Sequence, residues 1–127
     1  MKVLVVDDLM IMRRLIANSL SEIGLKDSVS VKSGEEALEA MDKDKFDLVV
    51  TDWVMANIDG LQLTLKIRER EDTKDIPILM ITALDDKDNV IKALNAGVND
   101  YIVKPFTPSI LKKKIEKVTN KKDWIIS

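Results

Sequence analysis

The 127-residue sequence contains neither cysteine nor histidine. Without cysteine there are no disulfides, no thiol catalysis and no cysteine-ligated zinc or iron–sulfur site. Without histidine there is no histidine-based acid–base catalysis and no Ser-His-Asp triad. Any chemistry must therefore use carboxylates, hydroxyls, lysines and, if a metal takes part, a hard cation.

The sequence also has no long apolar run and no strong excess of one charge. No run approaches the roughly 20 apolar residues of a membrane span, and the N-terminal apolar run is too short for a signal peptide. Twenty basic and 22 acidic residues give a net charge of −2, which provides no general attraction to nucleic acid or anionic membrane. We expect a single cytoplasmic domain without nucleic-acid or membrane partners.

Five short apolar runs alternate with segments of helical spacing. The runs are KVLVVD (2–7), DSVSV (27–31), FDLVVTD (46–52), IPILMIT (76–82) and DYIVK (100–104). The first, third and fourth are almost continuously apolar, which is typical of parallel strands covered on both faces. The alternation predicts an α/β fold with right-handed crossovers.

The segments between the runs carry helix signals. Ser33 and Glu36 form the pattern of a capping box, Asp59 can cap a third helix, and Thr107 with Pro108 can open a fifth. The apolar stripe expected to face inward in the first helix consists of Met12, Leu15, Ile16, Ser19, Leu20 and Ile23.

Four of the five predicted strands end in a polar side chain. These residues are Asp7 with Asp8, Asp52, Thr82 and Lys104. In an open α/β sheet, ligands bind at the carboxyl ends of the strands. Each residue also has a simpler interpretation: Asp8 could only cap the first helix, Asp52 could be a turn residue, Thr82 a satisfied hydroxyl and Lys104 a solvated lysine. The convergence of all of them favours a functional site.

The predicted site has an excess of negative charge. Two carboxylates about 4 Å apart repel by about 4 kcal/mol at an effective dielectric constant near 20, and Lys104 balances only one of them. Oxygen ligands without nitrogen or sulfur suit Mg²⁺. A magnesium ion, a lysine and a hydroxyl together could hold a phosphoryl group.

The stretches VLVVDD, MRR, TDWVM, DG, MITA and YIVKPFTP resemble the response-regulator receiver domains of two-component signalling, and within them the CheY-type single-domain chemotaxis regulators. The resemblance implies a flavodoxin-like, doubly wound sheet of five parallel strands in the order 2-1-3-4-5, with five helices. It implies a receiver domain over residues 1–120, followed by a C-terminal tail at 121–127.

The resemblance also implies the role of each site residue. Asp52 is similar to the phosphoacceptor that a histidine kinase modifies. Asp8, Asp52 and the backbone carbonyl of Val54 resemble the direct Mg²⁺ ligands, and Asp7 a ligand acting through water. Lys104 and Thr82 would contact the phosphoryl oxygens, and Lys104-Pro105 is similar to the family's cis peptide.

The resemblance further implies a switch and an output face. Tyr101 is similar to an aromatic switch residue that turns inward on phosphorylation. The output face formed by the fourth helix, fifth strand and fifth helix would include Val90, Leu94, Tyr101, Val103 and Lys114, with Ile91 and Val98 supplying the core instead. We expect a monomer whose partners are a chemotaxis-type histidine kinase and a flagellar motor switch protein; a dedicated phosphatase stays open.

Three positions depart from the family pattern. Ala56 replaces a proline, and Val54 and Leu84 replace residues that are often polar in chemotaxis relatives, which predicts slower hydrolysis of the phosphorylated form. Trp124, Ile125 and Ile126 in the tail are expected to dock back onto the domain.

Three other functions remain as alternatives. A stand-alone receiver in a non-flagellar relay would have the same site. An aspartate-nucleophile phosphatase would normally have its nucleophile after the first strand and another aspartate two residues later. A nucleotide or flavin binder would need a glycine-rich loop after that strand. The non-flagellar receiver is compatible with this sequence, whereas the sequence lacks both the phosphatase pattern and the glycine-rich loop.

Overall fold

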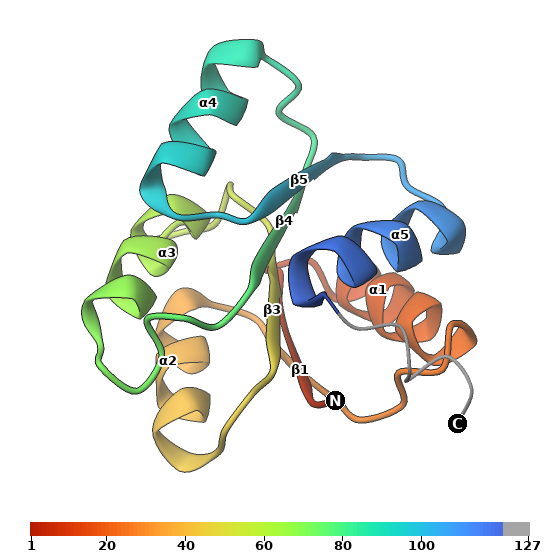
Figure 1. Cartoon of the computed structure of the whole chain (residues 1–127), viewed down its shortest axis with the longest axis horizontal. Helices are drawn as coiled ribbons and strands as arrows, with labels where there is room; N and C mark the ends of the chain where they lie inside the picture. The colour runs from red at the N-terminus through yellow and green to blue at the C-terminus, as the bar shows by residue number, and fades with distance from the viewer. Residues whose placement is uncertain (121–127) are drawn as a thin grey trace.

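The computed structural model describes residues 1–120, and the predicted tail at 121–127 lies outside the described residues. Five parallel strands form one sheet in the order β2-β1-β3-β4-β5 (Figure 1). The strands are β1 (Val3–Val6), β2 (Ser28–Val31), β3 (Leu48–Thr51), β4 (Ile78–Thr82) and β5 (Asp100–Val103). This order and the five helices confirm the predicted flavodoxin-like fold.

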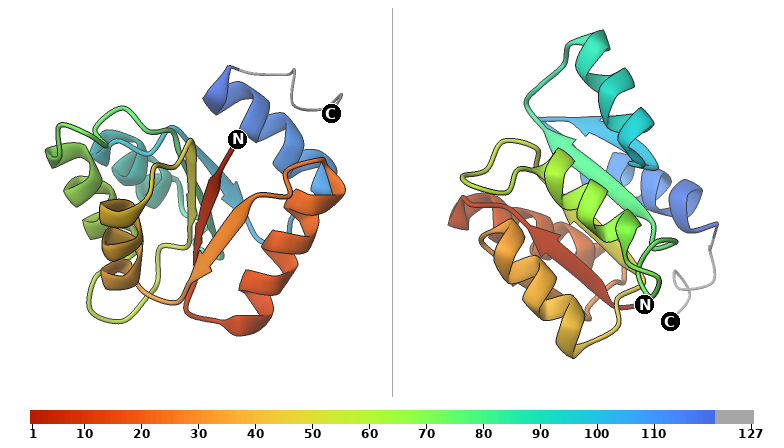
Figure 2. Two further views of the ribbon diagram at one scale, coloured as in Figure 1. Left: turned by 90° about the horizontal axis from the view of Figure 1, so that it is seen from below. Right: turned by 90° about the vertical axis from the view of Figure 1, so that its left-hand side faces the viewer.

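The helices cover both faces of the sheet. They are α1 (Met10–Glu22), α2 (Gly34–Lys43), α3 (Gly60–Glu69), α4 (Lys87–Ala96) and α5 (Pro108–Thr119). Helices α1 and α5 lie on one face, and α2, α3 and α4 lie on the other (Figure 2). Within the described residues no helix is long and apolar enough to cross a membrane.

Alternate residues of each strand enter different halves of the core. Val3 and Val5 of β1 pack with α1 and α5, whereas Leu4 and Val6 pack with α2 and α3. All four are fully buried. Because both faces are covered, β1 has no polar residue until it ends, which explains its continuous apolar run.

The second, third and fifth helices begin at the predicted capping residues, but one predicted capping contact differs. The Ser33 hydroxyl accepts the Glu36 N–H, but the Glu36 carboxylate accepts the N–H of Lys32 rather than that of Ser33. The reciprocal capping box instead occurs in α3, where Asp59 and Gln62 each bond the other's backbone N–H.

Two predictions of which apolar side chains face the core are wrong. In α1, Ile16 and Leu20 are buried, but Leu15 is 47% exposed. In α4, Val90 packs against the core, whereas Ile91 is 45% exposed. In both helices the mistaken residue is adjacent in sequence to the buried one, and successive helical residues are rotated by about 100°.

Candidate functional site

The carboxyl ends of the strands bring the predicted acids and lysine together. Val6 of β1 pairs with Thr51 of β3, so the residues that follow them, Asp7 and Asp52, are also neighbours. Lys104, after β5, places its Nζ atom 2.9 Å from Asp52 Oδ2 and 3.4 Å from Asp7 Oδ2. Three strands thus contribute to one cluster of two carboxylates and one ammonium group.

Backbone N–H groups fix the orientation of both carboxylates. Asp52 Oδ1 accepts the N–H of Trp53 at 2.6 Å, and Asp7 Oδ1 accepts the N–H of Leu9 at 3.0 Å. Asp7 is fully buried and Asp52 is 7% exposed. Both side chains are therefore held in place before any ligand binds.

The electrostatics of the cluster show a shortage of positive charge. Burial raises the pKa of Asp7 above its ordinary value, and the charge of Asp52 raises it further, against the opposing effects of the Leu9 N–H and Lys104. Burial would lower the pKa of Lys104, but its hydrogen bond to Asp52 and the charges of both acids raise it. One ammonium group serves two carboxylates, so the cluster carries a net negative charge.

The structure excludes the simpler interpretation of Asp8. The N-cap of α1 is Leu9, and no side chain caps this helix. Asp8 is exposed, and among residues 1–120 its side chain takes part in no hydrogen bond or ion pair. It lies next to Asp7, with its oxygens available to a ligand.

The donor set fits a hard cation such as Mg²⁺. The available donors are carboxylate oxygens and backbone carbonyls, which Mg²⁺ prefers. In the described part of the chain, no three acidic side chains are already grouped closely enough to form a metal cluster. The sequence predicted that three acids converge, but the structure brings together only Asp7 and Asp52, with an exposed Asp8 beside them. Mg²⁺ commonly keeps several waters and takes only one or two carboxylates.

Thr82 is the last residue of β4, and a backbone hydrogen bond joins it to the residue that follows β5. The N–H of Lys104 donates to the Thr82 carbonyl at 2.9 Å, which fixes the lysine at the same rim. Thr82 is 1% exposed, and its hydroxyl accepts the N–H of Leu84 at 3.5 Å. The Lys104–Pro105 peptide is cis, as expected.

Tyr101 is already turned inward. The residue is 7% exposed, and its hydroxyl donates to the carbonyl of Leu84 at 2.6 Å. Burial, with the charges of Asp52 and Asp85, raises the pKa of Tyr101 to about 12. The structure therefore places Tyr101 in the inward position, and its role as a switch on phosphorylation stays a prediction.

The predicted output face is only partly exposed. Leu94 and Val103 are 44% and 39% exposed, but Val90 packs against the core. Lys114 donates to Asp100 at 3.0 Å, and Lys117 makes a second ion pair with the same carboxylate. Of the five residues assigned to this face, Leu94 and Val103 are the two with large exposed apolar surface.

Sequence reasoning assigned no role to three residues that support the site. Arg13 donates to the Asp7 carbonyl at 2.8 Å, and the Thr51 hydroxyl donates to the Asp52 carbonyl at 2.8 Å. Gly60 allows the start of α3 to approach the loop after β3, because a Cβ atom there would lie 2.1 Å from the Asp52 carbonyl oxygen. The sequence pairs Thr51-Asp52 and Asp59-Gly60 are the signals that could have identified Thr51 and Gly60.

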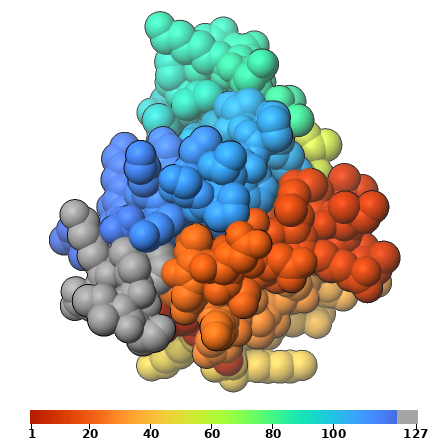
Figure 3. Space-filling model, turned by 90° about the vertical axis from the view of Figure 1, so that its right-hand side faces the viewer, coloured from red at the N-terminus to blue at the C-terminus, as the bar shows by residue number. Residues whose placement is uncertain are grey.

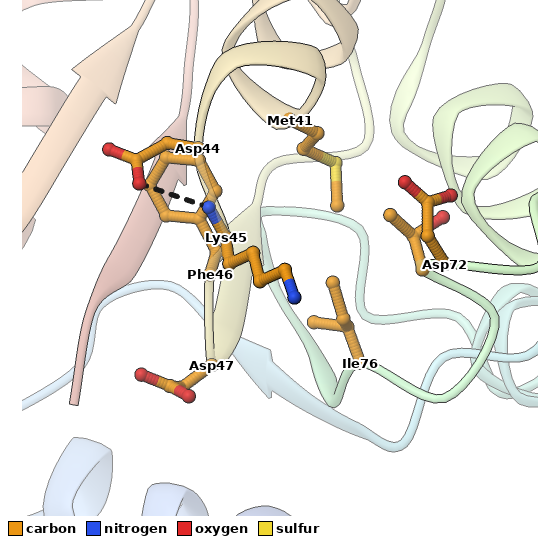
Figure 4. Close-up of a pocket in the computed structure, with 8 residues that line it drawn as sticks. Met41, Asp44, Lys45, Phe46, Asp47, Asp72 and Ile76 are labelled. Carbon is orange, nitrogen blue, oxygen red and sulfur yellow. Dashed lines mark hydrogen bonds between the residues drawn. The ribbon is translucent and has the colours of Figure 1, made fainter.

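A separate hollow of about 330 Å³ lies at the amino ends of β3 and β4 (Figure 4). Its floor includes Met41 and Phe46, and its rim includes Asp44, Asp47 and Asp72. None of the predicted site residues lines it. The chemistry-bearing cluster is thus at one end of the sheet, and this hollow is at the other.

The chain matches known proteins over nearly its full length. Residues 3–116 match the family described as response regulator receiver domain. The chemotaxis protein CheY1 of Helicobacter pylori is 48% identical over 124 residues, which cover 97% of this chain and 100% of that protein.

Two solved structures show the same fold. A putative response regulator from Chloroflexus aurantiacus has a TM-score of 0.89 and 33% identity, covering 94% of this chain and 98% of that chain. The receiver domain of the sensor histidine kinase PA1611 from Pseudomonas aeruginosa has a TM-score of 0.85 and 26% identity, with the same coverage of each chain; it has a magnesium ion coordinated in its active-site cleft.

Proposed function

The chain belongs to the response regulator receiver domain family, and we propose that it is a cytoplasmic, chemotaxis-type response regulator that is phosphorylated on Asp52. The observation that carries this proposal is the pairing of Lys104 with Asp52 at 2.9 Å beside the buried Asp7. The receiver domain would extend to about residue 120, where α5 ends.

In the proposed reaction, a carboxylate oxygen of Asp52 attacks the phosphorus atom of a phosphohistidine on a kinase. The phosphorus–nitrogen bond breaks as the new phosphorus–oxygen bond forms, and the imidazole leaves. Lys104 stays beside the modified side chain and pairs with the phosphoryl oxygens, while the Thr82 hydroxyl donates to one of them. The chain supplies no histidine of its own, which agrees with a donor on another protein.

Asp8, Asp52 and the Val54 backbone carbonyl would hold Mg²⁺ directly, and Asp7 would act through water. When bound, Mg²⁺ neutralises charge on the phosphoryl oxygens. The net negative charge of the cluster and the exposure of Asp8 support this assignment.

The route from Asp52 to the surface would pass through Thr82, Leu84 and Tyr101. Movement of Thr82 toward the phosphoryl group would shift the segment whose Leu84 carbonyl accepts the Tyr101 hydroxyl. Hydrogen bonds to a charged group contribute about 1.5–3 kcal/mol each. Two of them approach the roughly 5.5 kcal/mol that converts a 1:99 equilibrium to 99:1.

The partners in this proposal are a chemotaxis-type histidine kinase and a flagellar motor switch protein, with Leu94 and Val103 in the output face. A stand-alone receiver in another relay would have the same chemistry and a different target. Binding of purified motor switch protein to phosphorylated and unphosphorylated samples distinguishes the two.

The site is tested by incubating the protein with Mg²⁺ and a small phosphodonor such as acetyl phosphate. We expect one acid-stable, base-labile phosphoryl group, absent from Asp52→Asn and present in Asp72→Asn, which changes an exposed acid at the other end of the sheet. A phosphoryl group on another residue would refute the assignment of Asp52. Sustained substrate turnover would favour a phosphatase instead.

A further inference from the structure

The hollow at the amino ends of β3 and β4 combines an apolar floor with an acidic rim. One wall is the segment 44–47 between α2 and β3, and the other comes from the segment between α3 and β4. Met41, Phe46 and Ile76 line it, and the first two are only 5% exposed. Small-molecule sites are typically of this kind, mostly apolar with a few polar groups that fix the ligand. We call it the amino-end hollow.

Hydrogen bonds and an ion pair hold the walls of the amino-end hollow in place. Arg68 donates to the carbonyls of Lys74 and Ile76 at 2.8 and 2.6 Å, which fixes the segment between α3 and β4. An ion pair of 2.7 Å between Arg70 and Asp42 joins the end of α3 to α2. The hollow is therefore formed before any ligand binds.

Two carboxylates on different walls of the hollow have no cationic partner within residues 1–120. Asp47 lies on the wall that leads into β3, and Asp72 lies on the wall that leads into β4 (Figure 4). Asp47 accepts only the backbone N–H of Lys2 at 2.7 Å, and Asp72 takes part in no hydrogen bond or ion pair. Asp44, in contrast, pairs with the Lys2 ammonium group. The apolar floor thus lies between two carboxylates that a dication could bridge.

Lys45 shows how an aliphatic cation fits the hollow. Its side chain extends across the hollow toward Ile76 (Figure 4), as lysine stems commonly do on apolar surfaces. Lys45 is exposed, and in the described part of the chain its ammonium group forms no ion pair. A side chain without such a partner can move aside, so a ligand with a similar methylene chain can take its place.

We propose that the amino-end hollow binds an aliphatic diamine. The methylene chain covers the apolar floor, one ammonium group pairs with Asp47, and the other pairs with Asp72. The segments 42–47 and 69–75 together contain seven acidic and four basic residues. This excess of negative charge attracts a dication and repels an anionic ligand.

The amino-end hollow is separate from the proposed phosphorylation site. It lies at the other end of the sheet from Asp52, and none of its lining residues belongs to the carboxylate cluster. Modification of Asp52 by acetyl phosphate should therefore be the same with and without a diamine. Failure of that modification in both samples would refute the proposed function and not the diamine site.

The test uses methionine-methyl NMR on the full chain with the diamine cadaverine, in the presence of Mg²⁺ to occupy the carboxylate cluster. The matched probe is aminopentanol, which has the same carbon chain and a hydroxyl in place of one ammonium group. We expect cadaverine to shift the methyl signal of Met41, which lines the hollow. Met10 and Met12 of α1 lie on the other face of the sheet, which Figure 3 shows with α1 in red, and their signals should not move.

The affinities should follow the number of ion pairs. We expect a Kd in the millimolar range for cadaverine and a Kd about two- to fivefold weaker for aminopentanol, because an exposed ion pair contributes little. Added salt should reduce the difference between the two probes.

Variants of exposed residues test the position of the two ammonium groups. Asp47→Asn with Asp72→Asn should weaken cadaverine binding by roughly fivefold and remove its advantage over aminopentanol. Glu22→Gln with Asp88→Asn removes the same charge from α1 and α4 and should leave the affinity unchanged. Lys45→Gln should strengthen binding, because it removes a competing ammonium group. Circular dichroism checks that each variant is folded.

Four outcomes would overturn the diamine proposal. The first is no shift of the Met41 signal at high millimolar cadaverine, and the second is equal affinity for aminopentanol. The third is an equal loss of affinity in the Glu22→Gln with Asp88→Asn variant, which would reduce the effect to general attraction by an acidic protein. The fourth is a shift of the Trp53 indole signal without a shift of Met41, which would place the diamine at the carboxylate cluster.

Discussion

Replacing Asp7 with asparagine should stabilise the protein at neutral pH. Asp7 is fully buried, and its carboxylate shares one ammonium group with Asp52. Asparagine has nearly the same shape, and its carbonyl oxygen can still accept the N–H of Leu9. The substitution removes a negative charge from the cluster and leaves Lys104 to Asp52 alone.

The distances set the size of the effect. The Lys104 Nζ atom lies 3.4 Å from one carboxylate oxygen and 2.9 Å from the other, so these oxygens are at most about 6 Å apart. At an effective dielectric constant near 20, two charges at this distance repel by about 3 kcal/mol. By the same relation, the lost attraction between Lys104 and Asp7 at 3.4 Å is about 5 kcal/mol. The substitution also removes the cost of burying the Asp7 charge, which amounts to several kcal/mol for a buried ion and is the largest cause of the raised pKa. We expect a net gain of about 1–2 kcal/mol, or roughly 4–8 °C in Tm for a chain of this length.

The gain should depend on pH in a defined direction. Because the pKa of Asp7 is raised in the folded state, its contribution to stability is fully present below the ordinary value of 3.8 and is lost as the pH rises through the raised value. Asparagine does not ionise, so the advantage of the variant should be largest above the raised pKa and disappear in acid. Mg²⁺ should reduce the difference in stability between the variant and the wild type, because it stabilises the folded wild type by binding to the charged site.

Urea unfolding followed by circular dichroism, from acid to neutral pH with and without Mg²⁺, measures these effects. Asp72→Asn serves as the control, since it removes an exposed charge far from the cluster. The electrostatic explanation is wrong if Asp7→Asn is less stable than the wild type at neutral pH without Mg²⁺, or if its gain is the same at every pH.

Three further predictions concern the surroundings of the cluster. Gly60→Ala should lower the free energy of unfolding by more than about 2 kcal/mol and slow Asp52 modification, because the new Cβ would lie 2.1 Å from the Asp52 carbonyl oxygen; wild-type unfolding and modification rates would contradict this. Val54→Asn with Leu84→Glu should speed hydrolysis of the phosphorylated protein by holding water near the phosphoryl group, and an unchanged dephosphorylation rate would show that these side chains do not control it. The single tyrosine permits an ultraviolet titration: Tyr101 should ionise only near pH 12, and since its pKa is raised, its contribution to stability is lost as the pH rises from about 10 through about 12. Ionisation at pH 10 in the folded protein would contradict the buried hydroxyl.

The alternation of apolar runs and helical segments was sufficient for the α/β class and for the location of the carboxylate cluster, whereas the strand order came from the resemblance to receiver domains. A parallel strand that is covered on both faces has room for Asp7 or Asp52 only where it ends, and parallel strands end at one rim. The same rule located Lys104 after β5.

Finer details were not predictable because they depend on tertiary contacts. Leu15 and Ile16 are both apolar and differ by one helical step, so only packing against the sheet decides which is buried. The orientation of Tyr101 depends on the Leu84 carbonyl, a partner that no periodic pattern identifies. The close approach at Gly60 likewise depends on where α3 meets the backbone of Asp52.

The antiparallel return of α5 has a practical consequence for handling the molecule. Strand β1 begins at Val3, and α5 runs back from the reactive rim to end at Thr119, so the beginning of the first strand and the end of the last helix are both near the far edge of the sheet (Figure 2). A purification tag, dye or biosensor tether joined to the N-terminus, ahead of Val3, would start from that far edge. Immobilisation through this point should therefore keep Asp52 oriented toward solution and leave its reagents unobstructed.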